Sequence, residues 1–239
     1  MTVPGRLWHI HATYRRFGLK EFLGRAPSKD PRPRGARLRL ALEELGPVFI
    51  KLGQALSTRP DIVPHDIADE LAKLQDRVPP FPSAEARALI EQALGKPVDA
   101  LFASFEDAPM AAASVAQVHG AVLRNDDGTP GMPVVVKVLR PGIEAKVAED
   151  IAVMYALARW AERWSPLARR VRPLAIVAEF EHILTDELDL MREGANACLL
   201  RRNWLGSPLI YHPIVFWDFT RPNVLVMERI EGISIRELD

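Results

Sequence analysis

Cysteine is nearly absent from this sequence, since Cys198 is the one cysteine among 239 residues. A disulfide within the chain and a metal cluster held by several cysteines are therefore excluded. No charge of one sign dominates, because 31 lysines and arginines balance 31 acids, and this balance gives no reason to expect a nucleic-acid partner. No segment approaches the roughly 18–20 apolar residues of a membrane-spanning helix. The first twenty residues also lack the apolar core of a signal peptide.

The pattern along the chain predicts three segments. Residues 1–36 hold an N-terminal helix and a linker rich in proline, glycine and charge, PSKDPRPRGA. This first helix either packs on its own domain or lies at a membrane interface, because basic residues surround its apolar stripe. Residues 37–100 show helical patterns, the first from about 37 to 56.

Residues 101–239 have a different texture. Three short strand-like runs come first, followed by two long helical patterns and two more strand-like runs. The helical patterns cover 142–164 and 173–204, and the last two strand-like runs cover 213–219 and 223–230. This order predicts an α+β domain with an antiparallel sheet, preceded by a helical extension.

One lysine stands inside an apolar strand, Lys137 in VVVKVL. Burying a lysine is costly unless it is paired, so a partner carboxylate is one interpretation. The other is a surface lysine at a sheet edge, whose charge reaches water. The segment before this strand, PMAAASVAQVHGAV, has the position of a phosphate-binding loop, but it carries Ala111, Ala112, Ala113 and Ser114 where such loops are usually rich in glycine.

Three acids lie close together in the helical pattern at 173–204, within TDELDLMREGAN. On a continuous helix Asp189 and Glu193 would be neighbours on one face, where like charges repel. A cation beside them would relieve that repulsion, and the candidates are Lys137 and a metal ion. Glu187 lies close by in the sequence and would add a third carboxylate. A solvated acidic face neutralised by local arginines is the alternative.

A further pattern lies in GPVFIKLGQALSTRPDIVP. Lys51 and Gln54 are three residues apart and share one helix face, opposite an apolar stripe. Gly53 between them weakens the helix, which indicates either close approach of a neighbour or a tolerated glycine.

Five motifs in this order resemble the UbiB/AarF family of atypical protein-kinase-like proteins, which is linked to ubiquinone biosynthesis. They are KLGQALSTRPDIVP, AAASVAQVHGA, VVVKVLRPG, ELDLMREGAN and VLVMERIEG. The resemblance implies a kinase-like small lobe, with a five-stranded antiparallel sheet and long helices, at 101–239. It also implies a helical KxGQ extension at 37–100 that carries Lys51 and Gln54, and an alanine-rich loop in place of the glycine-rich one.

The same resemblance assigns roles to individual residues. Lys137 corresponds to the lysine that contacts the α- and β-phosphates of ATP, and Glu193 to its ion-pair partner. Glu187 and Asp189 match the family's ExD motif. The hinge corresponds to Met227 as gatekeeper, with the backbones of Glu228 and Ile230 contacting adenine.

The resemblance implies an adenine nucleotide, ATP or ADP, as the cofactor. The alanines of the loop are expected to crowd the terminal phosphates and so to tune nucleotide selection. Their alternative role is to pack a strand turn. Isoprenoid quinone intermediates and quinone-biosynthesis proteins are the other implied partners. The expected location is the cytoplasm, with peripheral contact at the inner membrane. The chain ends shortly after the hinge, so the large lobe with its catalytic loop and Mg²⁺-binding aspartate is not part of it. Without them, two interpretations remain. The chain is part of an enzyme, or it is a non-catalytic nucleotide- or lipid-binding module or a truncated product.

Overall fold

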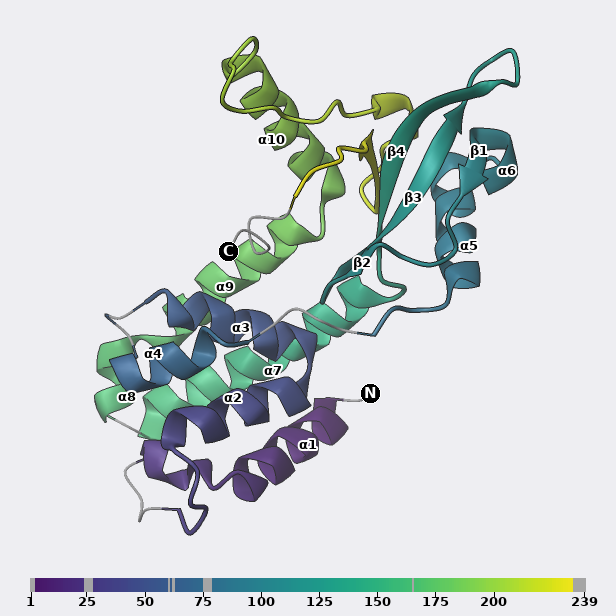
Figure 1. Cartoon of the computed structure of the whole chain (residues 1–239). Coiled ribbons are helices and arrows are strands. Elements are labelled where there is room, and N and C mark those ends of the chain that lie inside the picture. Colours follow the sequence, from purple (N-terminus) through teal and green to yellow (C-terminus); the bar gives the residue numbers. More distant parts are fainter. Residues whose placement is uncertain are drawn as a thin grey trace. The chain divides into compact units, whose positions relative to one another are not determined.

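The computed structural model describes residues 3–23, 28–59, 61, 63–74, 79–164 and 166–233. They belong to two compact units (Figure 1). The first unit combines Met1–Val78 with Gly142–Leu184, and the second combines Pro79–Pro141 with Thr185–Asp239. The units cut across the three segments expected from the sequence, because the helices after the lysine strand belong with the N-terminal helices.

The second unit is built on a five-stranded antiparallel sheet. Its strands are β1 (Phe102–Phe105), β2 (Ala111–Ala112), β3 (Ala116–Arg124), β4 (Pro130–Leu139) and β5 (Val224–Glu228). The order is β1-β3-β4-β5, and β2 pairs with β3. The expected α+β class with an antiparallel sheet is therefore confirmed.

One face of this sheet carries the core of the second unit. Helices α5 (Ser83–Leu94) and α6 (Val98–Leu101) cover it, and both lie beside the sheet in Figure 1. Val134, Val136 and Val138 are fully buried on this face of β4. Because successive side chains of a strand point to opposite faces, Lys137 belongs to the other face of the sheet.

The helix expected over 173–204 is two helices, α9 (Pro173–Glu187) and α10 (Leu190–Asn203). The chain becomes extended at Asp189, where φ is −110° and ψ is 93°. The Asp189 side chain accepts a hydrogen bond from the backbone N–H of Met191 and so caps the start of α10.

The single helix expected over 37–56 is also two helices, α2 (Arg34–Leu45) and α3 (Pro47–Ser57). Gly46 separates them with a φ of 99°, a conformation that glycine adopts at little cost. Pro47 follows and starts α3, because its missing N–H is not needed in a first turn.

The strand expected over 213–219 is a third difference. Val215 forms a single bridge to Met227, and the 3₁₀ helix η2 (Trp217–Phe219) follows at once. The Phe216 N–H donates to the Val226 carbonyl, so the segment still runs beside β5 for a short distance.

The first unit is helical. Besides α2, α3 and most of α9 it contains α1 (Val3–Arg16), η1 (Leu19–Leu23), α4 (His65–Leu71), α7 (Ile143–Trp164) and α8 (Pro166–Val171). A buried ion pair joins α1 to α7: Arg6 Nε lies 2.5 Å from Asp150 Oδ1, and Arg6 Nη2 donates to the Leu45 carbonyl at the end of α2. Across the described ranges, none of the helices combines the length and apolarity needed to cross a bilayer.

Candidate nucleotide site

An ion pair lies on the sheet face opposite the core. Lys137 Nζ is 2.8 Å from Glu193 Oε1 and 2.6 Å from Oε2, so β4 and α10 are joined by two charge-assisted hydrogen bonds. The side chains are 25% and 41% exposed, which leaves the pair within reach of a ligand. The pairing expected from the sequence is present in the structure.

Apolar side chains surround the lysine on the same face. Lys137 pairs with Val118 of β3, and Val135, two residues earlier, lies between Gly120 and Met227. Directly paired residues of an antiparallel sheet point to one face. Val118, Val135 and Met227 therefore form a half-buried apolar surface next to the ammonium group. A flat apolar surface beside a cation suits a planar base that carries phosphates.

Close packing of α10 on the sheet brings the glutamate within reach. A Cβ on Gly194 would lie 3.2 Å from Leu225 Cδ1, 3.3 Å from Trp217 Cη2 and 3.4 Å from Val215 Cγ1. These distances are tight for a Cβ, so a larger residue here would require the Leu225, Trp217 and Val215 side chains to shift by a few tenths of an ångström. Glu193, the residue before Gly194, reaches Lys137 from this helix.

The expectation that Asp189 and Glu193 share a helix face is wrong. Asp189 precedes α10, and its carboxylate is bound to the backbone of that helix, whereas Glu193 lies within α10 and binds Lys137. Glu187 is the last residue of α9. The acids of the expected cluster thus do not lie on one continuous helix.

The alanine-rich segment is a tight hairpin. Ala111 and Ala112 form β2, and the Ala113 N–H donates to the Ala116 carbonyl across the turn, at 2.8 Å. Ser114 within the turn is fully buried. None of these residues has a positive φ, so the turn does not use the conformations for which phosphate-binding loops need glycine.

Arg140, which the sequence interpretation missed, holds this turn. Its Nε donates to the Ala113 carbonyl at 2.9 Å, and its backbone N–H donates to the Val115 carbonyl at 2.8 Å. A third bond runs from Nη2 to the Pro79 carbonyl. Burial lowers the pKa of the Arg140 guanidinium from its usual value. The position of this arginine, directly after the lysine strand, was the signal available in the sequence.

The residues of the expected hinge lie at and after the end of β5. Met227 points to the Lys137 face, as its pairing with Val135 shows. The Glu228 N–H donates to the Ile214 carbonyl at 2.8 Å, and its carboxylate accepts from the Tyr211 hydroxyl at 2.7 Å. This bond to Glu228 raises the pKa of Tyr211. Ile230 follows the strand and is half exposed.

A protein-family model matches residues 73–239, and its description is "ABC1 atypical kinase-like domain". The chain belongs to the ABC1 atypical kinase-like family. The resemblance found in the sequence is thereby confirmed.

Curated relatives of this ABC1 chain carry the name "Probable protein kinase UbiB". The protein from Marinobacter nauticus is 57% identical over 205 residues, which cover 86% of this chain and 37% of the relative. The protein from Azotobacter vinelandii is 54% identical over 210 residues, which cover 88% of this chain and 38% of the relative. The chain thus spans somewhat more than a third of the length of the curated relatives it matches.

A solved structure supports the kinase-like fold. The chain is similar to Rv3197 from Mycobacterium tuberculosis, solved in complex with erythromycin, with a TM-score of 0.57 and 29% sequence identity. The match covers 82% of this chain and 48% of that one.

The two residues of the KxGQ pattern belong to the first unit of the ABC1 chain, whereas Lys137 belongs to the second. Gln54 Nε2 donates to the Leu74 carbonyl and so joins α3 to the chain after α4. Gly53 allows this packing, since a Cβ there would lie 2.3 Å from Leu74 Cδ1. Lys51 lies half-buried on the same helix.

A second ion pair, also missed in the sequence, lies near the hinge. Arg229 Nη1 is 2.6 Å from Glu106 Oε1. The Glu106 carboxylate occupies the space beside Gly120, where a Cβ would lie 2.5 Å from it. Nothing in the local sequence links these residues, because they are 123 positions apart.

On the core face of the sheet, a line of hydrogen bonds runs through two fully buried polar side chains, Gln117 and His119. Gln117 Oε1 accepts from the Phe81 N–H at 3.1 Å, and Gln117 Nε2 lies 2.9 Å from His119 Nε2. His119 Nδ1 lies 2.8 Å from the Glu106 carbonyl. His119 also stacks on Phe105, so it is a packed histidine.

The site thus combines an ammonium group paired with a carboxylate, an apolar surface, and a hairpin whose carbonyl groups are hydrogen-bonded to Arg140. Within the described ranges, no three His, Cys, Asp or Glu side chains are arranged to hold a metal ion. The chemistry available to these residues is binding and orientation of an anionic ligand with a flat apolar part.

Proposed function

We propose that this chain is the nucleotide-binding part of a UbiB-type atypical kinase, that it binds ATP or ADP on the Lys137 face, and that it supports ubiquinone biosynthesis. The observation that carries the proposal is the Lys137–Glu193 pair, held between a strand and a helix beside an apolar surface. Kinase-like proteins use this arrangement to contact the α- and β-phosphates.

Each part of the site has a role in this proposal. Glu193 orients the Lys137 ammonium group, which binds the phosphates. Val118 and Val135, which lie on one face of the sheet, contact one face of the base, and Met227 lies beside them at its edge. The Glu228 N–H is already bonded to Ile214, so its carbonyl and the Ile230 backbone are the groups proposed to meet adenine.

The alanine hairpin is proposed to select among nucleotides. Its Ala113 and Val115 carbonyls are bonded to Arg140, which restrains the turn against rearranging around a terminal phosphate. Methyl groups of the alanines add a steric limit at the same place. A diphosphate is therefore expected to fit with less distortion than a triphosphate.

Mg²⁺ is the metal that kinase-like proteins use to neutralise phosphate charge. Glu193 and Asp189 do not fit such a site by themselves: Glu193 is bound to Lys137, and Asp189 is bound to the first turn of α10. We therefore assign no step of phosphoryl transfer to this chain.

Nucleotide binding is tested by calorimetric titration of the 239-residue chain with ATP and with ADP. Lys137→Met should weaken binding about tenfold or more, since a hydrogen bond to a charged group contributes roughly 1.5–3 kcal/mol. Lys96→Met is the matched control, because Lys96 is an exposed lysine of the same unit. Equal losses in both variants, or no binding by the unchanged chain, would contradict the proposal.

The pathway is tested separately, by the ubiquinone content of cells that carry the Lys137→Met substitution at the native locus. We expect less ubiquinone at unchanged protein abundance, with isoprenoid quinone intermediates or quinone-biosynthesis proteins as the proposed partners. Normal ubiquinone content would contradict the proposed role in ubiquinone biosynthesis. The proposed nucleotide binding would still be tested by calorimetry.

A further inference from the structure

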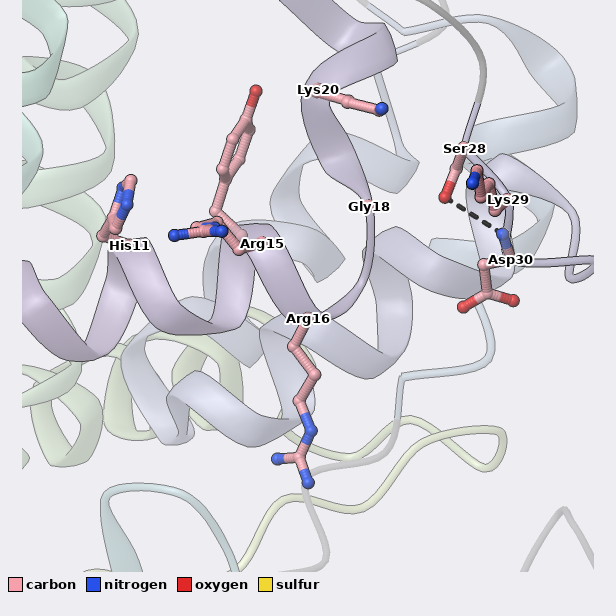
Figure 2. A pocket seen from close by; sticks show the side chains of 9 residues that line it. His11, Arg15, Arg16, Gly18, Lys20, Ser28, Lys29 and Asp30 are labelled. Atoms are coloured by element: carbon pink, nitrogen blue, oxygen red, sulfur yellow. Dashed lines mark hydrogen bonds between the residues drawn. The ribbon is translucent and has the colours of Figure 1, made fainter.

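A hollow of about 630 Å³ lies in the first unit and shares no residue with the Lys137 face. It is formed by the second half of α1, the turn into η1, and the loop at 28–30 (Figure 2). The residues that line it are His11, Tyr14, Arg15, Arg16, Gly18, Lys20, Ser28, Lys29 and Asp30. The volume is within the range of small-molecule sites, roughly 300–1,000 Å³.

Most of the charge in this hollow is positive, and part of it is already neutralised. Arg16 is bound to Glu44 at 2.8 Å, and in Figure 2 its side chain points away from His11 and Lys20. Asp30 is bound by Arg32, whose hydrogen bonds lower the Asp30 pKa to about 2. The single acid of the lining thus has its own partner.

Three cations of the lining have no such partner. Among the described residues, Arg15, Lys20 and Lys29 make no ion pair and no side-chain hydrogen bond. A basic residue in the last turn of a helix complements the helix dipole, which accounts for Arg15. The α1 dipole does not account for Lys20, which lies in the five-residue 3₁₀ helix η1, or for Lys29, which lies in the loop at 28–30. Figure 2 shows Lys20 extending toward the side of the hollow where Ser28 and Lys29 lie.

A buried hydroxyl adds a second, independent indication. Tyr14 lines the hollow, and its Oη is shielded from solvent and makes no hydrogen bond within the part of the chain that the structure describes. Buried polar atoms are normally satisfied, so a bound group with an acceptor oxygen would explain this one.

Several contacts hold the frame of the hollow together. Gly18 has a φ of 61°, and a Cβ there would lie 2.0 Å from Ser28 Oγ, so only glycine lets the two segments meet. Arg37 is almost fully buried and donates to the Phe17 and Gly18 carbonyls, and it also binds Glu21. Arg37 thereby ties the end of α1 and the following turn to η1.

We propose that this hollow binds a phosphate ester. Phosphate oxygens accept from an arginine fork, from ammonium groups and from a hydroxyl together, and the volume leaves room for an organic substituent beside the phosphate. The ester is either a soluble metabolite or the headgroup of a phospholipid, because both present the same group to Arg15, Lys20, Lys29 and Tyr14.

The test uses the 239-residue chain and two probes. Calorimetry with glycerol 3-phosphate detects a soluble ester. Sedimentation with phosphatidylcholine vesicles, and with vesicles of equimolar phosphatidylcholine and phosphatidylglycerol, detects a lipid headgroup. Binding of glycerol 3-phosphate assigns a soluble ester, and selective binding of the anionic vesicles alone assigns a lipid; binding of neither overturns the proposal.

Two variants separate the hollow from general electrostatic attraction. Neutralising Arg15, Lys20 and Lys29 to glutamine should weaken binding at least about tenfold. The matched control neutralises three exposed arginines of α7 and α8 and removes the same charge; these are Arg163, Arg169 and Arg170. Equal losses in the two triple variants would overturn the proposal.

Tyr14→Phe tests the hydroxyl separately, because this substitution leaves the net charge of the chain unchanged. It removes the hydroxyl and keeps the ring, so a loss of about fivefold is expected from one missing hydrogen bond. Unchanged binding in Tyr14→Phe, together with equal losses in both triple variants, would identify the hollow as an ordinary basic surface.

Discussion

The Lys137–Glu193 pair should contribute only about 1 kcal/mol to the stability of the folded chain. At a separation of about 2.7 Å, two unit charges attract by about 1.5 kcal/mol in water. Fixing two long side chains offsets part of this, and exposed pairs are typically worth about 0.2–1 kcal/mol. A deeply buried pair would behave differently, since loss of one partner costs about 3–5 kcal/mol. With side chains 25% and 41% exposed, this pair belongs nearer the first class.

A double-mutant cycle measures this coupling. Urea unfolding followed by circular dichroism is compared for the unchanged chain, Glu193→Gln, Lys137→Met and the double variant. A parallel cycle with Glu85→Gln and Lys96→Met serves as the control, because these are exposed residues near opposite ends of the α5 region and should not couple.

The coupling should also shrink in about 1 M salt, where the Debye length is about 3 Å. A coupling above about 3 kcal/mol would mean that the pair is buried far more deeply than its exposure indicates. A coupling of zero at low salt would mean that β4 and α10 do not hold the two charges together. Either result would refute the reasoning behind the candidate site.

Three further predictions concern other parts of the chain. Asp150→Asn should lower the free energy of unfolding by about 3–5 kcal/mol, because the buried guanidinium of Arg6 keeps its charge and loses its partner; a loss below about 1 kcal/mol in urea unfolding would contradict this. Ala113→Gly should raise the affinity for ATP relative to ADP, because removal of a methyl group frees the turn; calorimetric titration with an unchanged preference would show that the alanine serves packing. The Asp30 carboxyl should titrate at about 2 by NMR and return toward 3.8 in Arg32→Gln. Since the pKa is lowered in the folded state, its contribution to stability is complete above the ordinary pKa and is lost as pH falls through about 2, and a titration unaffected by Arg32→Gln would contradict the assignment.

The sheet and its lysine could be predicted because their signals are local. The alternation in VVVKVL places three valines on one face and Lys137 on the other, and the strand needs no distant partner to show this. The pairing of Lys137 with Glu193 came from the family resemblance, and the chain order alone left a solvated acidic face as an alternative.

The helix breaks were visible in the sequence but were outweighed by periodicity. Gly46 and Pro47 interrupt an apolar pattern that continues on both sides of them, and the turn chemistry prevailed over the pattern. Asp189 interrupts the second pattern in the same way, by bonding to the backbone of α10.

The remaining contacts could not be predicted because their partners are far apart in the chain. Arg6 and Asp150 are 144 positions apart, and Glu106 and Arg229 are 123 apart. Neither residue of such a pair differs, in its local sequence, from an exposed charge. Their pairing follows from tertiary structure, which places two segments side by side and removes water from between them.

The hydrogen-bond line through Gln117 and His119 has a fixed direction. A carbonyl only accepts, so the contact with Glu106 requires the proton on His119 Nδ1, and His119 Nε2 must then accept from the amide of Gln117. The amide orientation is fixed in turn by the Phe81 N–H, which needs the Gln117 oxygen. His119, the most buried histidine of the chain, therefore serves as a polarised link between the residues before α5 and the loop between β1 and β2.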